Sequence, residues 1–234
     1  MLSRKIHRIL TWVVGLQVAL WMLSGLAMSL FDIETVRGSH VLKEKAEAVM
    51  DIKAVDRILT QIDSTQQIKS LKAVLIGDAV YYQFDTSDGS PQLYNASGMR
   101  QSLITEEMVR SEVNARYAGP GSIAEVVLLE QPITEIRGRD LPIWQVKMQD
   151  FEGVRLYVSA TTGQIQTVRT RWWRIFDFFW MLHIMDYSDR EDTSHPLLML
   201  AASSGLMIAM TGLWLLVRTT LSRRRRKNQA HTAE

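Results

Sequence analysis

The 234-residue chain contains no cysteine. This absence excludes disulfide bonds, thiol nucleophiles, zinc–cysteine sites and iron–sulfur clusters. The sequence also lacks the HExxH motif of zinc peptidases, the GxSxG motif of serine hydrolases and the Walker loop. No GxGxxG fingerprint for a nicotinamide or flavin nucleotide is present either. These absences leave few conventional routes to catalysis.

Charged side chains are missing from two long stretches, Ile9–Phe31 and Pro196–Val217. Each stretch is long enough to cross a hydrocarbon core of about 30 Å as a helix. Soluble helices of this length nearly always carry a charged face. The sequence therefore predicts two transmembrane helices, at 9–31 and 196–217. A signal peptide is the alternative for the first stretch, although its apolar run exceeds a usual signal core.

Acidic residues are almost absent from the two ends of the chain. Of 25 acidic residues, 24 lie between Asp32 and Asp192. Segments 1–8 and 218–234 are basic instead, through Arg4, Lys5, Arg8, Arg218, Arg223, Arg224, Arg225, Arg226 and Lys227. The positive-inside rule then predicts both termini in the cytoplasm and the middle in the periplasm, at a bacterial inner membrane. The polybasic tail is typical of a cytoplasmic segment that sets the topology and contacts anionic lipids, and we do not expect it to bind nucleic acid.

The exported segment 32–170 is predicted to contain two copies of one unit, each a helix followed by an antiparallel meander. Apolar residues at helical spacing favour the first helix, and Thr105 is a capping residue for the second. The predicted elements are helix 52–62, strands 68–76, 79–85 and 92–95, helix 105–117, and strands 123–130, 143–149, 154–159 and 164–169. The fold class is therefore α+β, with two transmembrane helices flanking a periplasmic domain of two repeats.

The two predicted units can be aligned on a shared Leu–Tyr pair. Segment 93–98 (LYNASG) aligns with segment 156–163 (LYVSATTG) when two extra residues are allowed. This alignment predicts that Tyr94 and Tyr157 occupy matching places. It also places Leu156 on a strand face that is predicted to be buried.

The segment LYVSATTGQIQTV resembles the last hairpin of a PepSY domain. The flanking segments RKIHRILTWVVGLQVALWMLSGLAMSL, LHIMDY and GLMIAMTGLWLLV resemble the spans of PepSY-associated transmembrane proteins. The resemblance covers nearly the whole chain and implies two PepSY-like repeats. It also implies that haem b is held by histidines of the "HR" and "LH" motifs, as in members that reduce ferric siderophores. Those histidines are His7 and His183.

Imidazole is a standard axial ligand for haem iron, and haem is the cofactor that a chain without cysteine can still ligate with histidine. His183 lies in 172–185, among three tryptophans and three phenylalanines, and His195 immediately precedes the second predicted span. His7 precedes the first span and His40 follows it, whereas His231 lies in the tail and is not a candidate. The cofactor-binding candidates are thus His183, His195 and His7. The alternative is an aromatic belt at the membrane interface, with these histidines at ordinary helix ends.

The predicted topology limits how one haem could be held. His7 and His183 fall on opposite membrane faces, so they cannot ligate one iron in the same chain. His183 would pair with His195 or His40, or two chains would each provide one ligand in a homodimer. Small residues in the spans permit such close helix packing; they are Ser24, Gly25, Ala27, Ala201, Ala202, Ser203, Ser204, Gly205 and Gly212.

An acidic run follows His183, within a predicted interfacial helix and acidic loop at 171–195. Its carboxylates belong to Asp186, Asp189, Glu191 and Asp192. Carboxylate oxygens suit ferric iron, so these residues, with His183 and His195, form the predicted metal site. The run departs from the glycine-rich continuation that the resemblance implies, and a solvated loop is the alternative.

Together these features predict an inner-membrane PepSY-type protein that aids transmembrane electron transfer and reduces ferric iron or a ferric chelate in the periplasm, through haem b. Electrons would come from quinol or a respiratory complex, because the chain has no nucleotide fingerprint. Such a protein would be a haem-dependent ferric reductase. The alternative is a non-enzymatic, membrane-tethered binding or inhibitory module, or an accessory subunit of a membrane reductase or transporter.

Overall fold

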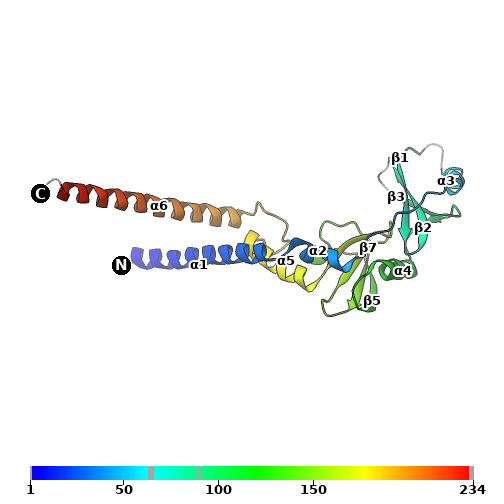
Figure 1. The fold of residues 1–234 in the computed structure, drawn as a ribbon, viewed down its shortest axis with the longest axis horizontal. Helices are drawn as coiled ribbons and strands as arrows, with labels where there is room; N and C mark the ends of the chain where they lie inside the picture. Colours follow the sequence, from blue (N-terminus) through cyan, green and yellow to red (C-terminus); the bar gives the residue numbers. More distant parts are fainter. Residues whose placement is uncertain (1, 63–65, 88, 90, 232–234) are drawn as a thin grey trace. The chain divides into compact units, whose positions relative to one another are not determined.

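The computed structural model describes residues 2–62, 66–87, 89 and 91–231, with side chains at 12 and, within those ranges, from 14 to 222. The chain divides into two compact units (Figure 1). One unit consists of Met1–Leu30 with Asp177–Glu234, and the other is the continuous segment Phe31–Phe176. The sequence analysis places a periplasmic domain at 32–170, and that assignment stays a prediction.

The first unit is helical. It contains α1 (Leu2–Leu30), the end of α5 (Arg171–Ile184) and α6 (Pro196–His231). Among the described residues, one helix, Pro196–Ser222, is long and apolar enough to cross a membrane, and none of its apolar window is buried. Val14–Leu30 is a shorter apolar helix, so the first span remains a prediction. The helix of the predicted second span continues beyond Val217, through the basic tail to His231.

Unit 31–176 has an α+β fold with two four-stranded antiparallel sheets, which confirms the predicted fold class at this level. It begins with two short helices that the sequence did not predict, α2 (Ile33–Arg37) and η1 (Ser39–Val41). After α3 (Ile52–Leu59), the first sheet contains β1 (Ile68–Ile76), β2 (Ala79–Thr86), β3 (Pro91–Asn95) and β4 (Arg100–Gln101). After α4 (Glu106–Arg116), the second contains β5 (Ser122–Leu129), β6 (Ile143–Gln149), β7 (Arg155–Ser159) and β8 (Ile165–Arg169), with η2 (Thr134–Ile136) between β5 and β6. Both sheets keep chain order, so the predicted succession of helix and meander is present twice.

The start of α4 follows from its sequence. Thr105 adopts an extended backbone conformation, and its hydroxyl accepts a hydrogen bond from the Met108 amide at 3.4 Å. Glu106 and Glu107 lie in the first turn, where negative charge is stabilised by the exposed amide groups. Glu112, on the next turns, is 2% exposed and accepts a hydrogen bond from the Gly77 amide at 2.8 Å. This bond ties the β1–β2 turn to α4.

Helix α4 packs against both sheets (Figure 1). Val109 and Val113 of α4 belong to one buried cluster with Leu93 of the first sheet and with Leu156 and Val158 of the second. Each of these side chains is at most 2% exposed. The main core of the unit is therefore the layer that α4 shares with the two sheets.

Helix α3 covers the opposite face of the first sheet. Ala54 and Ile58 of α3 form a second cluster with Tyr82, Phe84 and Tyr94. Tyr94 thus faces the helix of its own repeat.

Tyr157, by contrast, lies on the sheet face opposite Leu156 and α4. It packs with Ile136 and Ile143 in a third cluster. The prediction that Tyr94 and Tyr157 occupy matching places was therefore wrong. Successive side chains of a strand point to opposite faces of the sheet. An alignment of the two repeats that is one residue out therefore pairs a residue on one face with a residue on the other.

Candidate functional site

His183 is held by a single turn of α1 within the helical unit. Its ring stacks on Trp21, with centroids 5.0 Å apart and an interplanar angle of 9°. Nδ1 of His183 lies 3.2 Å from the Trp21 carbonyl oxygen and 3.2 Å from Ser24 Oγ. A Cβ atom added to Gly25 would come within 3.1 Å of His183 Cε1, so a larger residue there would press on the ring. Trp21, Ser24 and Gly25 together fix the position of the imidazole.

The hydrogen bonds of His183 define which nitrogen is available. A carbonyl oxygen can only accept, so the tautomer that forms a hydrogen bond with Trp21 is the one with its proton on Nδ1. Nε2 then carries the lone pair, and no described residue forms a hydrogen bond with it. Histidine ligands in metal and haem sites have this arrangement, in which one ring nitrogen donates to a carbonyl and the other binds the metal.

A second polar atom beside His183 is unsatisfied. The indole Nε1 of Trp21 is buried and has no hydrogen-bond partner among the described residues. Buried donors are normally paired, so an unpaired one beside a free imidazole nitrogen is consistent with a bound group. Among the described residues one chain places a single imidazole of this kind here, so it could hold a haem iron from one side only.

The other histidine candidates are in different situations. Nδ1 of His195 accepts a hydrogen bond from the Leu197 amide at 3.3 Å, so this ring caps α6. Nε2 of His40 lies 3.0 Å from Glu152 Oε2, within unit 31–176. The side chain of His7 lies outside the described residues. Of the histidines whose side chains are described, His183 alone keeps Nε2 free with its proton fixed on Nδ1.

The acidic run after His183 forms an ordered loop around Asp186. This residue is 2% exposed, and Oδ1 accepts bonds from the Ser188 amide, the Ser188 hydroxyl and the Asp189 amide. Oδ2 accepts bonds from the Glu191 and Asp192 amides at 3.1 and 3.2 Å. Desolvation alone would raise the pKa of Asp186, but these hydrogen bonds outweigh it and hold the pKa well below its usual range. The carboxylate therefore organises the loop.

Further contacts fix the end of the same loop. Arg190 forms an ion pair with Asp177, and its carbonyl oxygen accepts a hydrogen bond from Trp180 Nε1 at 3.1 Å. Within the described residues, no group of three or more histidine, aspartate or glutamate side chains is arranged to hold a metal ion. The predicted set of His183, His195, Asp186, Asp189, Glu191 and Asp192 thus stays a prediction.

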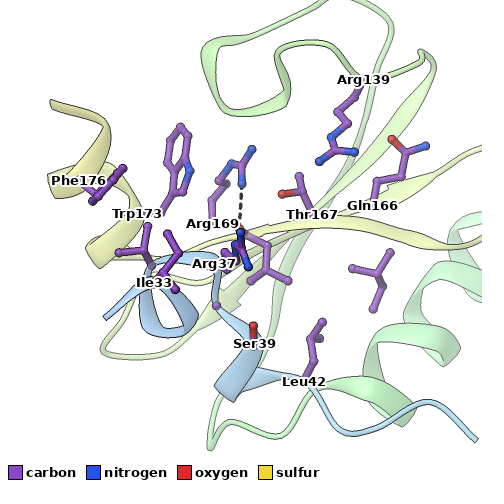
Figure 2. A pocket seen from close by; sticks show the side chains of 14 residues that line it. Ile33, Arg37, Ser39, Leu42, Arg139, Gln166, Thr167, Arg169, Trp173 and Phe176 are labelled. Atoms are coloured by element: carbon purple, nitrogen blue, oxygen red, sulfur yellow. Dashed lines mark hydrogen bonds between the residues drawn. The ribbon is translucent and has the colours of Figure 1, made fainter. Parts of the chain in front are cut away.

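Unit 31–176 contains a pocket of about 450 Å³ that the sequence did not predict. Its polar lining includes Arg37 at the end of α2, Arg139 after η2 and Arg169 at the end of β8 (Figure 2). Trp173 and Phe176 of α5 form an apolar part of the lining. The three arginines are far apart in the sequence, so the fold alone brings them to one cavity.

Arg169 is the best-anchored of these arginines. Its guanidinium lies over the Trp173 ring, 4.2 Å from the centroid, and Nε donates to the Glu135 carbonyl oxygen at 2.8 Å. Burial, followed by the positive charge of Arg139, lowers the pKa of Arg169 to about 10. The group stays cationic at neutral pH, and the negative charge of Glu135 offsets only part of this lowering of the pKa.

Glu135 stabilises the wall beside this pocket. One carboxylate oxygen accepts from Arg155 at 2.7 Å and from Arg174 at 2.9 Å, and the other accepts from the Tyr157 hydroxyl at 2.6 Å. The Glu135 side chain is 12% exposed. Burial would raise the pKa of Glu135, but the bonds from Arg174 and Tyr157 and the nearby positive charges lower it below its ordinary value. Burial and the Glu135 charge raise the pKa of Tyr157.

These contacts predict a pH-dependent stability for a fragment 31–176. Because the folded pKa of Glu135 is lowered, its stabilising contribution is complete above pH 4.5 and is lost as pH falls through the folded value. We expect Glu135→Gln to lower the free energy of unfolding by about 2–3 kcal/mol at pH 7 and to flatten its decline below pH 4.5. Urea unfolding at pH 7 and at pH 4 measures both effects.

Glu125→Gln is the control, since its ion pair with Lys147 is exposed and contributes under about 1 kcal/mol. Equal losses of unfolding free energy in both variants would contradict the prediction.

Both sites, the surroundings of His183 and the arginine-lined pocket, are described from the contacts within this chain. No family model, curated protein or solved structure matches it.

Proposed function

We propose that this chain is a membrane-anchored haem b protein of the PepSY-associated type. In this proposal, α1 and α6 cross a bacterial inner membrane, and unit 31–176 is a double PepSY-like domain in the periplasm. The apolar stretch Pro196–Ser222 supports the second crossing, and the uncharged Ile9–Phe31 supports the first. The repeated order of helix and four-stranded meander supports the double domain.

The observation that carries the haem proposal is the state of His183. Its Nδ1 proton is committed to the Trp21 carbonyl oxygen, and its Nε2 lone pair is unused among the described contacts. His183 would hold the haem iron, with Trp21 and Ser24 orienting the ring and Gly25 leaving room for it. Haem bound there would supply one-electron chemistry to a chain that has no cysteine and no nucleotide motif.

A second ligand has to come from elsewhere. His195 uses Nδ1 to cap α6, and His40 is engaged with Glu152, so neither is preferred. We propose that His183 of a second copy completes the site in a homodimer. Electrons from quinol or a respiratory complex would then pass to ferric iron or a ferric chelate in the periplasm.

Absorbance spectroscopy of the purified full chain in detergent tests the haem proposal. We expect a Soret band and a reduced-minus-oxidised difference spectrum, with about one haem for two chains if the dimer forms. A haem content near one per chain would contradict the shared site. A colourless protein, expressed with haem in supply, would contradict haem binding altogether.

The proposed topology has its own test. Reporter fusions after Arg218 should show the cytoplasmic phenotype, and fusions near residue 100 should show the periplasmic phenotype, because the basic residues flank both apolar stretches on the terminal side. The two fusions serve as controls for each other. A periplasmic C-terminus would contradict the two-span topology.

One observation favours a second candidate function. The arginine-lined pocket gives unit 31–176 a site for an anionic ligand that needs no redox centre. A membrane-tethered binding module or an accessory subunit would use that pocket alone. A colourless protein that still binds an anion through the pocket would favour this second function.

A further inference from the structure

The pocket in unit 31–176 concentrates positive charge. Of the described residues that line it, Arg37, Arg139 and Arg169 are cationic and none is acidic. These arginines come from α2, from the loop after η2 and from β8, and Figure 2 shows them around the same cavity. Three cationic side chains from separate elements repel one another, and an anion in the cavity would offset that repulsion.

The protein offsets these charges only in part, because the negative charge of Glu135 acts on Arg169 but lies outside the pocket lining. Arg169 donates to the carbonyl oxygens of Glu135 and Val168, which carry no net charge. Arg139 is exposed, and its positive charge acts on Arg169 across the pocket. The carboxylate of Glu135 already accepts from Arg155, Arg174 and Tyr157.

The charge of Arg37 is only partly compensated. Its ion pair with Glu34 measures 3.3 Å, and the two side chains are 67% and 59% exposed. Exposed pairs of this kind are weak, and Glu34 also accepts from the Ser39 hydroxyl at 2.6 Å. The pocket therefore retains most of its positive charge.

The rest of the lining is apolar on one side. Ile33 of α2 and Trp173 and Phe176 of α5 lie there, and Trp173 stacks on Arg169. A ligand that fits this pocket carries its anionic group toward the arginines and an apolar part toward the aromatic rings. Such a ligand is amphipathic.

We propose that this pocket binds the phosphate group of an amphipathic phosphoester. Guanidinium groups match phosphate oxygens in pairs of parallel hydrogen bonds, and a phosphate offers more acceptor oxygens than a single carboxylate to arginines that approach from three directions. Either a phospholipid headgroup or a soluble phosphate compound presents this chemistry. The lipid source rests on the proposed membrane topology, because only Phe31 and Asp32 separate the end of α1 from α2.

Native mass spectrometry of the full chain released from detergent tests the proposal. The probes are dioctanoyl phosphatidylglycerol, inorganic phosphate and citrate, titrated separately. We expect Arg139→Gln to weaken binding of the phosphate-bearing probe at least about tenfold. Arg100→Gln removes the same charge from the exposed strand β4 and should leave binding unchanged. Thermal melts of both variants should match the wild type, because both arginines are exposed.

The probes separate the two sources. Binding of phosphatidylglycerol without binding of inorganic phosphate identifies a lipid, whereas binding of inorganic phosphate with the same dependence on Arg139 identifies a soluble phosphate. The proposal is overturned if neither phosphate probe binds, if citrate binds more tightly than both, or if Arg100→Gln has the same effect as Arg139→Gln. His183→Ala should leave phosphate binding unchanged, so the failure of haem binding and the failure of this site can be told apart.

Discussion

Replacing His183 with alanine is expected to remove haem from the purified full chain. The imidazole is the one described histidine ring whose Nε2 is free while Nδ1 is fixed by a backbone carbonyl. Without it, the turn at Trp21–Gly25 offers no nitrogen ligand, and haem iron needs an axial ligand to be held. We expect the Soret absorbance per chain to fall by at least tenfold, and ferric reduction to fall with it.

Two matched variants control for the loss of a histidine. His40→Ala removes a ring that pairs with Glu152 in the other unit, so it should keep the full absorbance. His195→Ala removes the cap of α6, at a cost of about 1 kcal/mol, and should also keep haem. If His195→Ala removes haem and His183→Ala does not, the ligand assignment is wrong. Mixed dimers of wild-type and His183→Ala chains should hold an intermediate amount of haem.

Leu156→Asp is expected to unfold unit 31–176. Leu156 is completely buried, in the cluster that α4 shares with both sheets. The variant loses about 2 kcal/mol of apolar burial and places a carboxylate where the cluster residues offer no polar partner. We expect the free energy of unfolding to fall by more than about 4 kcal/mol, which is a large part of the stability of an ordinary domain.

Chemical denaturation of a fragment 31–176, followed by circular dichroism, measures this effect. Leu103→Asp is the matched control, because the same substitution occurs at a side chain that is 47% exposed. It should change the free energy of unfolding by less than about 1 kcal/mol. A cooperative transition for Leu156→Asp near that of the wild type would contradict the assignment of the core.

The strands were predictable because their signals are local. The predicted bounds 68–76 and 143–149 are those of β1 and β6, since alternating apolar residues end at Gly77 and at the turn before Gly153. Helix α2 has five residues, too few to show a helical period, and β4 has only two. Asp32 and Gly38, which cap α2 at its two ends, were the signal that could have revealed it.

The faces and sites depend on contacts that no local pattern contains. Both repeats contain the Leu–Tyr pair. The helix of the first repeat covers the sheet face that carries Tyr94, whereas the helix of the second covers the face that carries Leu156. The pocket needs Arg37, Arg139 and Arg169, which are far apart in the sequence and come together only in the folded unit. Similarly, the aromatic composition around His183 is visible in the sequence, whereas its stacking on Trp21 depends on how α1 meets the end of α5.

The position of α4 makes the two repeats inseparable. Val109 and Val113 pack against Leu93 of the first repeat as well as Leu156 of their own, and Glu112 binds the Gly77 amide of the first. A chain cut between the repeats would expose an apolar sheet face in the first half and an apolar helix face in the second. Although each sheet follows a helix of its own, we expect neither half to be stable alone, because α4 completes the core of both sheets.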